Sequence, residues 1–238
     1  VMLAAFMIGL HVASTLGLVG LSLLSIFGDR PMWELVGLIA WNTNTNFVLV
    51  AIPLFLLMGE LLLRSGESDR LYRVLAHWLS PIPGGLLHSN IAACAIFSAI
   101  SGSSVATAAT IGSVAIPAFR NRGYNERLVL GSLAGGGALG NLIPPGIAFI
   151  VYGVLMEVSI GRLYIAGIVP GILVSLLFIL FIFVVALVRP HWAPREPGVP
   201  FPVMLRDLLD MLPTFGLIFL CLGTIYLGVA TPTESAAF

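Results

Sequence analysis

The sequence predicts an all-α polytopic membrane protein. Its 238 residues are 58% hydrophobic and only 9% charged, and the mean hydropathy is +1.05. A soluble domain carries about 25% charged residues, so this chain lacks the charge needed to cover its surface in water. Its apolar runs are close to the ~20 residues that a helix needs to cross a bilayer. The formal net charge of zero gives no electrostatic support to a nucleic-acid partner.

The apolar runs define the expected membrane segments in chain order. They are spans at about 3–27 and 47–63, a hydroxyl-rich hairpin at 86–119, a broken span at 128–156, a span at 163–188, and a last span from 212 to about 229. A proline-rich loop occupies 190–202. Residues 31–46, with two tryptophans, and the amphipathic residues 68–79 suit the headgroup interface.

The stretch from Ser98 to Pro117, SAISGSSVATAATIGSVAIP, is unusually polar for an apolar run. We expect its backbone to turn back inside the bilayer at Gly102. Hydrocarbon offers no partner to the helix-terminal amides and carbonyls, so such a tip must be buried in protein or line a wet cavity. Its oxygens suit a hard cation such as Na⁺, and its helix-starting amides suit a carboxylate. A packing face between helices is the alternative, because small residues are typical of both.

A second interruption follows at Gly135–Gly137 and at Asn141–Gly146, in the segment GGGALGNLIPPG. Pro144 and Pro145 donate no amide, and a residue that precedes proline is disfavoured in a helix. Carbonyl groups upstream of the two prolines are therefore left without their helical hydrogen-bond donors. A broken helix beside a re-entrant tip is how transporters build ion sites at the bilayer midplane, which favours the binding interpretation.

All eleven basic residues are arginines, and their positions predict the topology. If residues 86–119 enter and return, nine arginines share one side, which the positive-inside rule makes cytoplasmic. Only Arg30 and Arg162 then lie outside. Two full crossings satisfy the same count, but they need roughly 40 residues. The nine are Arg64, Arg70, Arg73, Arg120, Arg122, Arg127, Arg189, Arg195 and Arg206.

Local patterns predict smaller features. Glu60 is expected to pair with Arg64, four residues on, rather than to act as a proton-coupling carboxylate. Thr231 to Glu234 (TPTE) has the pattern of a helix N-cap, which fits an ordinary helix start or a helix that restarts inside the membrane. Cys94 and Cys221 lie far apart, and no disulfide is expected between them.

Four segments together resemble the large membrane subunit of TRAP (tripartite ATP-independent periplasmic) transporters. They are IPLFLLMGELLLRSG from Ile52, GSSVATAATIGSVAIPAFRNRGYN from Gly102, LGNLIPPGIAFIVYGVLMEVSIGRLYIAGIVPG from Leu139, and GVATPTESAAF from Gly228. The resemblance covers nearly the whole chain in order. It implies an inverted-repeat elevator-type fold with one re-entrant hairpin and one broken helix per half. Residues 1–211 would form the first repeat, and 212–238 the truncated start of the second half.

The same resemblance implies Na⁺-coupled uptake of an organic acid, such as a C4-dicarboxylate or sialic acid, across the bacterial inner membrane. It implies a periplasmic substrate-binding protein and a small four-span membrane subunit as partners, and no cofactor apart from Na⁺ as the coupling ion. The motifs assign the Na⁺ site, largely backbone oxygen, to Gly102, Ser103, Ser104, Thr107, Asn141, Pro144 and Gly146. Gly146 stands where the family often has serine, and Asn141 where an apolar residue is usual.

Other functions remain as alternatives. A single-component ion or carboxylate exchanger shares this architecture, and a channel or scaffold subunit would need no coupling ion. An intramembrane enzyme is disfavoured, because the sequence contains neither the GxSxG nor the HExxH motif.

Overall fold

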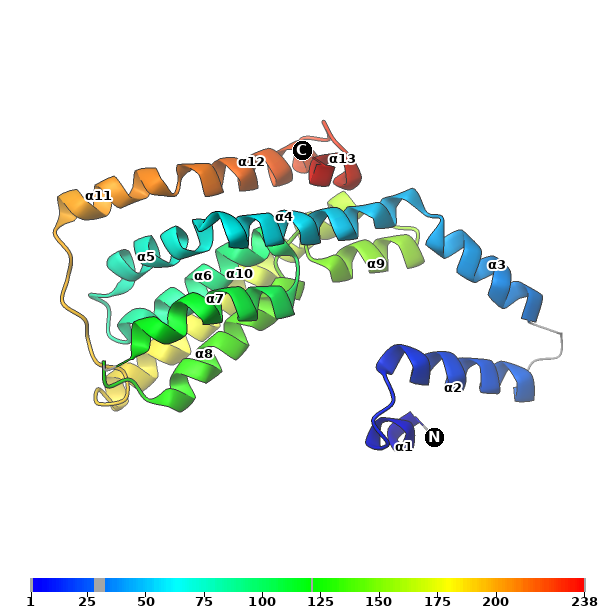
Figure 1. Ribbon diagram of the computed structural model, residues 1–238, viewed down its shortest axis with the longest axis horizontal. Helices are drawn as coiled ribbons and strands as arrows, with labels where there is room; N and C mark the ends of the chain where they lie inside the picture. The colour runs from blue at the N-terminus through cyan, green and yellow to red at the C-terminus, as the bar shows by residue number, and fades with distance from the viewer. Residues whose placement is uncertain (1, 28–32, 121, 238) are drawn as a thin grey trace. The chain divides into compact units, whose positions relative to one another are not determined.

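A computed structural model describes residues 2–27, 33–120 and 122–237. Helices are the only regular elements in this part of the chain, which confirms the predicted all-α class (Figure 1). The chain separates into two compact units, Val1–Asn46 and Phe47–Phe238. This separation concerns packing, and the repeat boundary at 211/212 stays a prediction.

The first unit contains α1 (Met2–Met7), α2 (Val12–Phe27) and α3 (Trp33–Asn44). The expectation of one continuous helix over 3–27 is wrong, because α1 ends before Gly9. Gly9 has φ +84°, its amide donates to Phe6 O (3.0 Å), and the amide of Leu10 donates to Ala5 O (3.2 Å). These two bonds form a Schellman motif, which stops a helix at a left-handed glycine. Arg30 and Pro31 lie outside the described residues.

Two helices of the second unit are long and apolar enough to cross a bilayer. The first joins η1 (Phe47–Val50) to α4 (Ala51–Ser65), and the second is α10 (Ile160–Val188). The spans predicted at 47–63 and 163–188 fall within them. A pair bent by 45°, α11 (Phe201–Asp210) and α12 (Leu212–Tyr226), qualifies if it forms one span. Because α11 starts at Phe201, the predicted loop at 190–202 ends earlier than expected.

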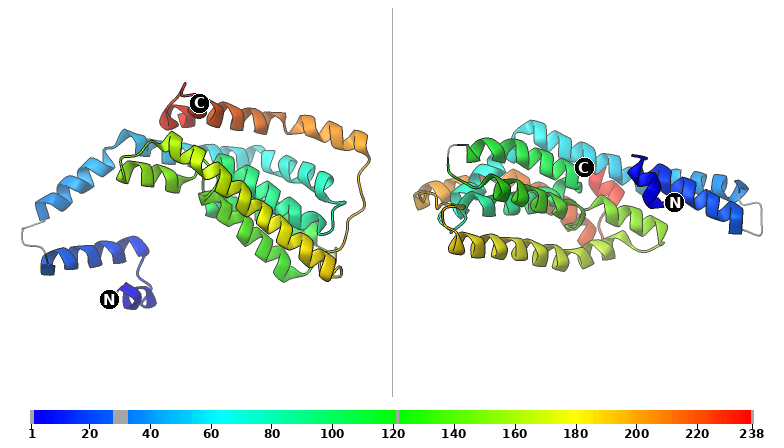
Figure 2. Two further views of the ribbon diagram at one scale, coloured as in Figure 1. Left: turned by 180° about the vertical axis from the view of Figure 1, so that it is seen from behind. Right: turned by 90° about the horizontal axis from the view of Figure 1, so that it is seen from below.

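The predicted hairpin range contains two helices, α6 (Gly85–Ser101) and α7 (Ser104–Phe119). With 17 and 16 residues, each is about 25 Å long, less than the ~30 Å hydrocarbon core. Figures 1 and 2 show them side by side, with α5 (Glu67–Leu79) and α8 (Glu126–Ala138) packed against them. The α5–α6, α7–α8 and α10–α11 connections lie at one end of the unit (Figure 1), as a returning hairpin requires.

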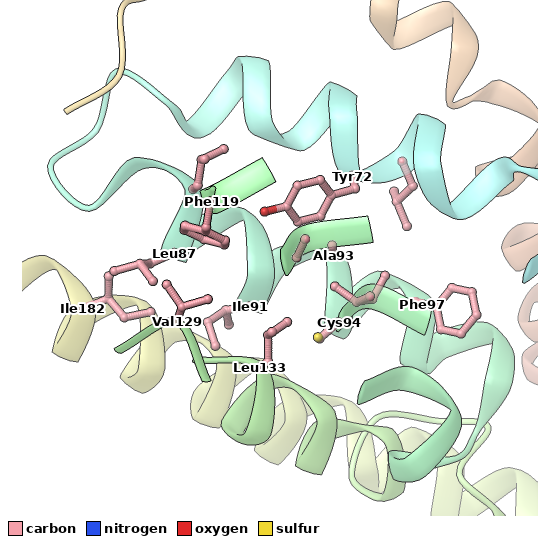
Figure 3. Packing of buried hydrophobic residues seen from close by; sticks show 14 of the residues in the cluster. Tyr72, Leu87, Ile91, Ala93, Cys94, Phe97, Phe119, Val129, Leu133 and Ile182 are labelled. Carbon is pink, nitrogen blue, oxygen red and sulfur yellow. The ribbon is translucent and has the colours of Figure 1, made fainter. Parts of the chain in front are cut away.

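Helix α6 forms the centre of the larger hydrophobic core. Its Leu87, Ile91, Cys94 and Phe97 are at most 2% exposed. They face residues of α5, α7, α8 and α10, among them Tyr72, Phe119, Val129, Leu133 and Ile182 (Figure 3). The hairpin is therefore surrounded by protein on several sides, as its backbone requires in a membrane.

A buried series of hydrogen bonds crosses this core. The Tyr72 hydroxyl donates to Asn90 Oδ1 (2.9 Å), and Asn90 Nδ2 donates to Ser132 Oγ (2.8 Å). Ser132 in turn donates to Val129 O (2.8 Å). These hydrogen bonds join α5, α6 and α8 and satisfy polar groups that would be costly to bury alone.

A smaller core joins α4, α10 and α12 with α9 (Ile147–Leu155) and α13 (Pro232–Ala237). Helix α13 begins with the predicted N-cap. Thr231 N donates to Glu234 Oε2 (2.8 Å), and Glu234 N donates to Thr231 Oγ1 (3.3 Å). This reciprocal pair is a capping box and confirms the helix start at Pro232.

Candidate functional site

The candidate site lies where the hairpin tip (residues 101–104) meets the break (residues 139–146). The tip turns at Gly102, which has φ +59° and donates its amide to Ser98 O (3.0 Å). Gly102 O accepts the amide of Ile147, the first residue of α9, at 3.1 Å. A Cβ atom built on Gly102 would lie 2.4 Å from Pro145 O. Glycine is therefore required here both by conformation and by space.

Two further glycines let the break approach the hairpin. A Cβ atom on Gly140 would lie 2.6 Å from Ser104 N and 2.7 Å from Ser103 O. A Cβ atom on Gly137 would lie 2.7 Å from Ala108 Cβ. Backbone thus packs on backbone at Gly140, and Gly137 leaves room for the Ala108 side chain. The glycine-rich segment before the two prolines serves close approach as well as interruption.

The hydroxyl groups of the tip have separate local roles. Ser103 Oγ accepts the amide of Ala106 (3.4 Å) and caps α7. Ser101 Oγ and Thr107 Oγ1 lie 2.9 Å apart in a buried pair that joins the two arms. Ser104 Oγ donates to Ala138 O at the end of α8 (3.5 Å). The tip therefore gathers hydroxyl oxygens that are hydrogen-bonded within the hairpin and to the end of α8.

The break replaces regular helix with a short irregular stretch. Helix α8 ends at Ala138, the 3₁₀ turn η2 covers Leu139–Asn141, and α9 begins after Gly146. Pro144, Pro145 and Gly146 are buried, whereas Asn141 is exposed. A Cβ atom on Gly146 would lie 3.0 Å from Asn141 O, so the Asn141 carbonyl faces the break.

The structure brings part of the predicted site together, whereas Pro144 packs against Gly167 of α10. Gly102, Ser103 and Ser104 meet the break directly, and Thr107 lies one turn along α7. Sequence reasoning left out the roles of Gly140 and Gly137, as well as the Pro145 carbonyl. The GGGALG pattern signals small residues, but nothing in it indicates what they approach.

The electrostatics of this site come from backbone rather than from charged side chains. Helices α7 and α9 both begin here, so their N-terminal amide dipoles favour a nearby negative charge. Helix α6 and η2 both end here, and the C-terminal carbonyl groups of helices favour a cation. The junction therefore combines helix ends of both polarities, one favouring an anion and the other a cation.

Two pairs of residues lie outside the site. Arg64 Nε lies 2.7 Å from Glu60 Oε1, which confirms the predicted pair on α4. Cys94 and Cys221 are both free and buried.

Comparison with known proteins adds independent information. The family model described as "Tripartite ATP-independent periplasmic transporter, DctM component" matches residues 1–238. A C4-dicarboxylate TRAP transporter large permease protein of Pseudomonas aeruginosa is 37% identical over 94% of this chain and 52% of its own length. The sialic acid TRAP transporter permease protein of Haemophilus influenzae is 34% identical over 80% of this chain and 31% of its own length. The chain spans about half the length of the C4-dicarboxylate relative.

Proposed function

The chain belongs to the DctM component family of tripartite ATP-independent periplasmic transporters, and we propose that its protein imports an organic acid together with Na⁺. It is a multi-pass membrane protein of a transport family, not an enzyme. The close contact between the hairpin tip and the break carries the proposal, because it joins two helix starts and two helix ends in one place. Relatives named for C4-dicarboxylate and sialic acid suggest the solute class.

The Na⁺ ion would be held mainly by oxygen atoms of the tip and the break. A hard cation prefers carbonyl and hydroxyl oxygens, which this region supplies. The candidates are Gly102, Ser103, Ser104 and Thr107 of the hairpin, with Asn141, Pro144 and Gly146 of the break. For Asn141 the backbone carbonyl, which faces the break, would be the ligand.

The carboxylate of the solute would approach the starts of α7 and α9. Amide groups at a helix N-terminus attract anions, and two such ends reinforce each other. A cation bound at the same junction would raise the affinity for the anion and vice versa, because each reduces the electrostatic cost of the other. This reciprocity would link the binding of the solute to the binding of the ion.

The remaining parts of the proposal follow the topology and the family. The arginine-rich end, which carries the α5–α6, α7–α8 and α10–α11 connections, would face the cytoplasm of a bacterium across its inner membrane. A periplasmic substrate-binding protein would deliver the solute, and a small four-span subunit would support the permease. Transport would proceed by an elevator movement of an inverted-repeat fold, of which this chain supplies the first hairpin.

Uptake by the full-length protein, reconstituted with both partners in proteoliposomes, tests the proposal. Succinate and N-acetylneuraminate serve as radiolabelled probes, with Na⁺ replaced by K⁺ at constant ionic strength. We expect uptake to need Na⁺ and the binding protein. The double substitution Ser103→Ala with Ser104→Ala should raise the Na⁺ concentration for half-maximal uptake, whereas Ser113→Ala, on the same helix, should not. Equal uptake in K⁺ would refute the coupling, and uptake without the binding protein would favour a single-component exchanger.

A further inference from the structure

Three segments that are distant in sequence converge at the open end of the hairpin, away from its tip. The amide of Leu86, near the start of α6, donates to the Tyr124 hydroxyl oxygen (3.4 Å). Arg122 Nη1, just beyond α7, donates to Glu196 Oε2 (2.9 Å). A Cβ atom on Gly85 would lie 2.6 Å from the Tyr124 hydroxyl oxygen and 3.6 Å from Glu196 Cγ. The two arms of the hairpin are therefore joined at this end through Tyr124 and Glu196.

The loop that carries Glu196 is anchored beside the hairpin. Asn125 N, at the start of α8, donates to Trp192 O (2.9 Å), and the Arg189 guanidinium lies 4.0 Å from the centre of the Trp192 ring. These contacts hold the loop near α7 independently of Glu196. Burial raises the pKa of Tyr124 to about 12, so its hydroxyl remains a proton donor next to the Glu196 carboxylate.

A cavity of about 430 Å³ lies between α5 and the last turns of α7. Val114 and Ala118 line it from α7, Tyr72 and Ala76 from α5, and Arg122 and Glu196 at the arginine-rich end, together with neighbouring residues. The end of α7 therefore has incomplete packing on this side. The opposite side of α7 is packed into the core through Ala115 and Phe119, so polar contacts act on the end of this helix mainly from the cavity side.

From these observations we propose that Glu196 is a positioning residue, which closes a latch on the open end of the hairpin and thereby sets the geometry of the tip. The latch is defined as Glu196 with Arg122 and Tyr124. The Arg122 side chain is 47% exposed and the Glu196 side chain 15%. Because Arg122 is open to solvent, we expect the pair to change an equilibrium by about fivefold. The latch is consequently weak enough to open reversibly next to the cavity.

Opening of the latch changes the angle between the two arms, and the arms carry this change to the tip. Each arm is about 25 Å long, so a small change in the splay of the arms displaces the tip relative to the break. A binding site needs its ligands placed to within about 0.5 Å. Opening the latch should therefore weaken cation binding, although Glu196 touches none of the tip oxygens named above. The Na⁺ readout rests on the proposed function, whereas the splay of the arms does not.

Two measurements on the full-length protein test the latch. Spin labels on Ile82→Cys and Arg120→Cys, which are exposed beside the two arms, report the distance between the arms; Cys94 and Cys221 are buried and should not react. The second measurement is the Na⁺ concentration that gives half of the maximal rise in melting temperature. The variants are Glu196→Gln and the charge swap Arg122→Glu with Glu196→Arg. Glu60→Gln is the control, since it breaks the exposed pair with Arg64 on α4.

In Glu196→Gln we expect a broader or longer label distance and a half-saturating Na⁺ concentration about threefold to fivefold higher. The charge swap should restore both values toward those of the parent, and Glu60→Gln should change neither. An unchanged label distance in Glu196→Gln, or a swap that fails to restore it, would overturn the latch. If the parent shows no stabilisation by Na⁺, the proposed coupling fails, and the label distance alone decides on the latch.

Discussion

Replacing Gly102 by alanine tests whether the tip and the break form one site. The left-handed conformation at φ +59° costs a non-glycine residue about 1–2 kcal/mol. The added Cβ would lie 2.4 Å from Pro145 O, whereas ordinary contact begins at 3.4 Å, so the two segments must separate by about 1 Å. Overpacking of this kind costs about 1–3 kcal/mol. Together the two effects predict a loss of about 2–5 kcal/mol in the free energy of unfolding.

The assay compares Gly102→Ala with Gly112→Ala in the full-length protein. Gly112 lies on α7 of the same hairpin, and a Cβ there meets nothing within 4 Å. Melting temperature in detergent and the half-saturating Na⁺ concentration are measured for both variants. Gly102→Ala should lower the melting temperature and raise the half-saturating Na⁺ concentration, because the hydrogen bond from Ile147 N to Gly102 O is strained when the tip moves. Similar behaviour of the two variants would refute the reasoning, since only Gly102 contacts the break.

Two other outcomes are expected. Asn90→Leu should lower the free energy of unfolding by about 3 kcal/mol, because it leaves the buried Tyr72 hydroxyl without its acceptor. A loss below about 1 kcal/mol in chemical denaturation would show that these buried hydrogen bonds contribute little. Single cysteines at the exposed positions Arg70 and Arg127 should react with an impermeant maleimide from the same side of the membrane, and one at Arg162 from the opposite side; labelling of the first two from opposite sides would exclude a returning hairpin.

Features that depend on neighbours along the chain could be predicted from the sequence. The turn at Gly102, the break before Pro144 and the Glu60–Arg64 pair all involve residues within about one helical turn of each other. Their backbone preferences act in any surroundings, so composition and spacing are enough to predict them. The missed break at Gly9 has the same local nature. Hydropathy averages over a window, and it does not register that one glycine can end a helix inside an apolar run.

Contacts between segments that are distant in sequence could not be predicted in this way. The sequence determined that this chain belongs in a membrane, that its helices are interrupted at Gly102 and before Pro144, and that hydroxyl groups gather around the first of these interruptions. Only the tertiary structure decided that Gly140 lies against the Ser103–Ser104 backbone and that Glu196 reaches Arg122, 74 positions away. The physical reason is that such contacts depend on how whole helices pack. Packing reflects the summed shape of many side chains rather than the preference of any one residue.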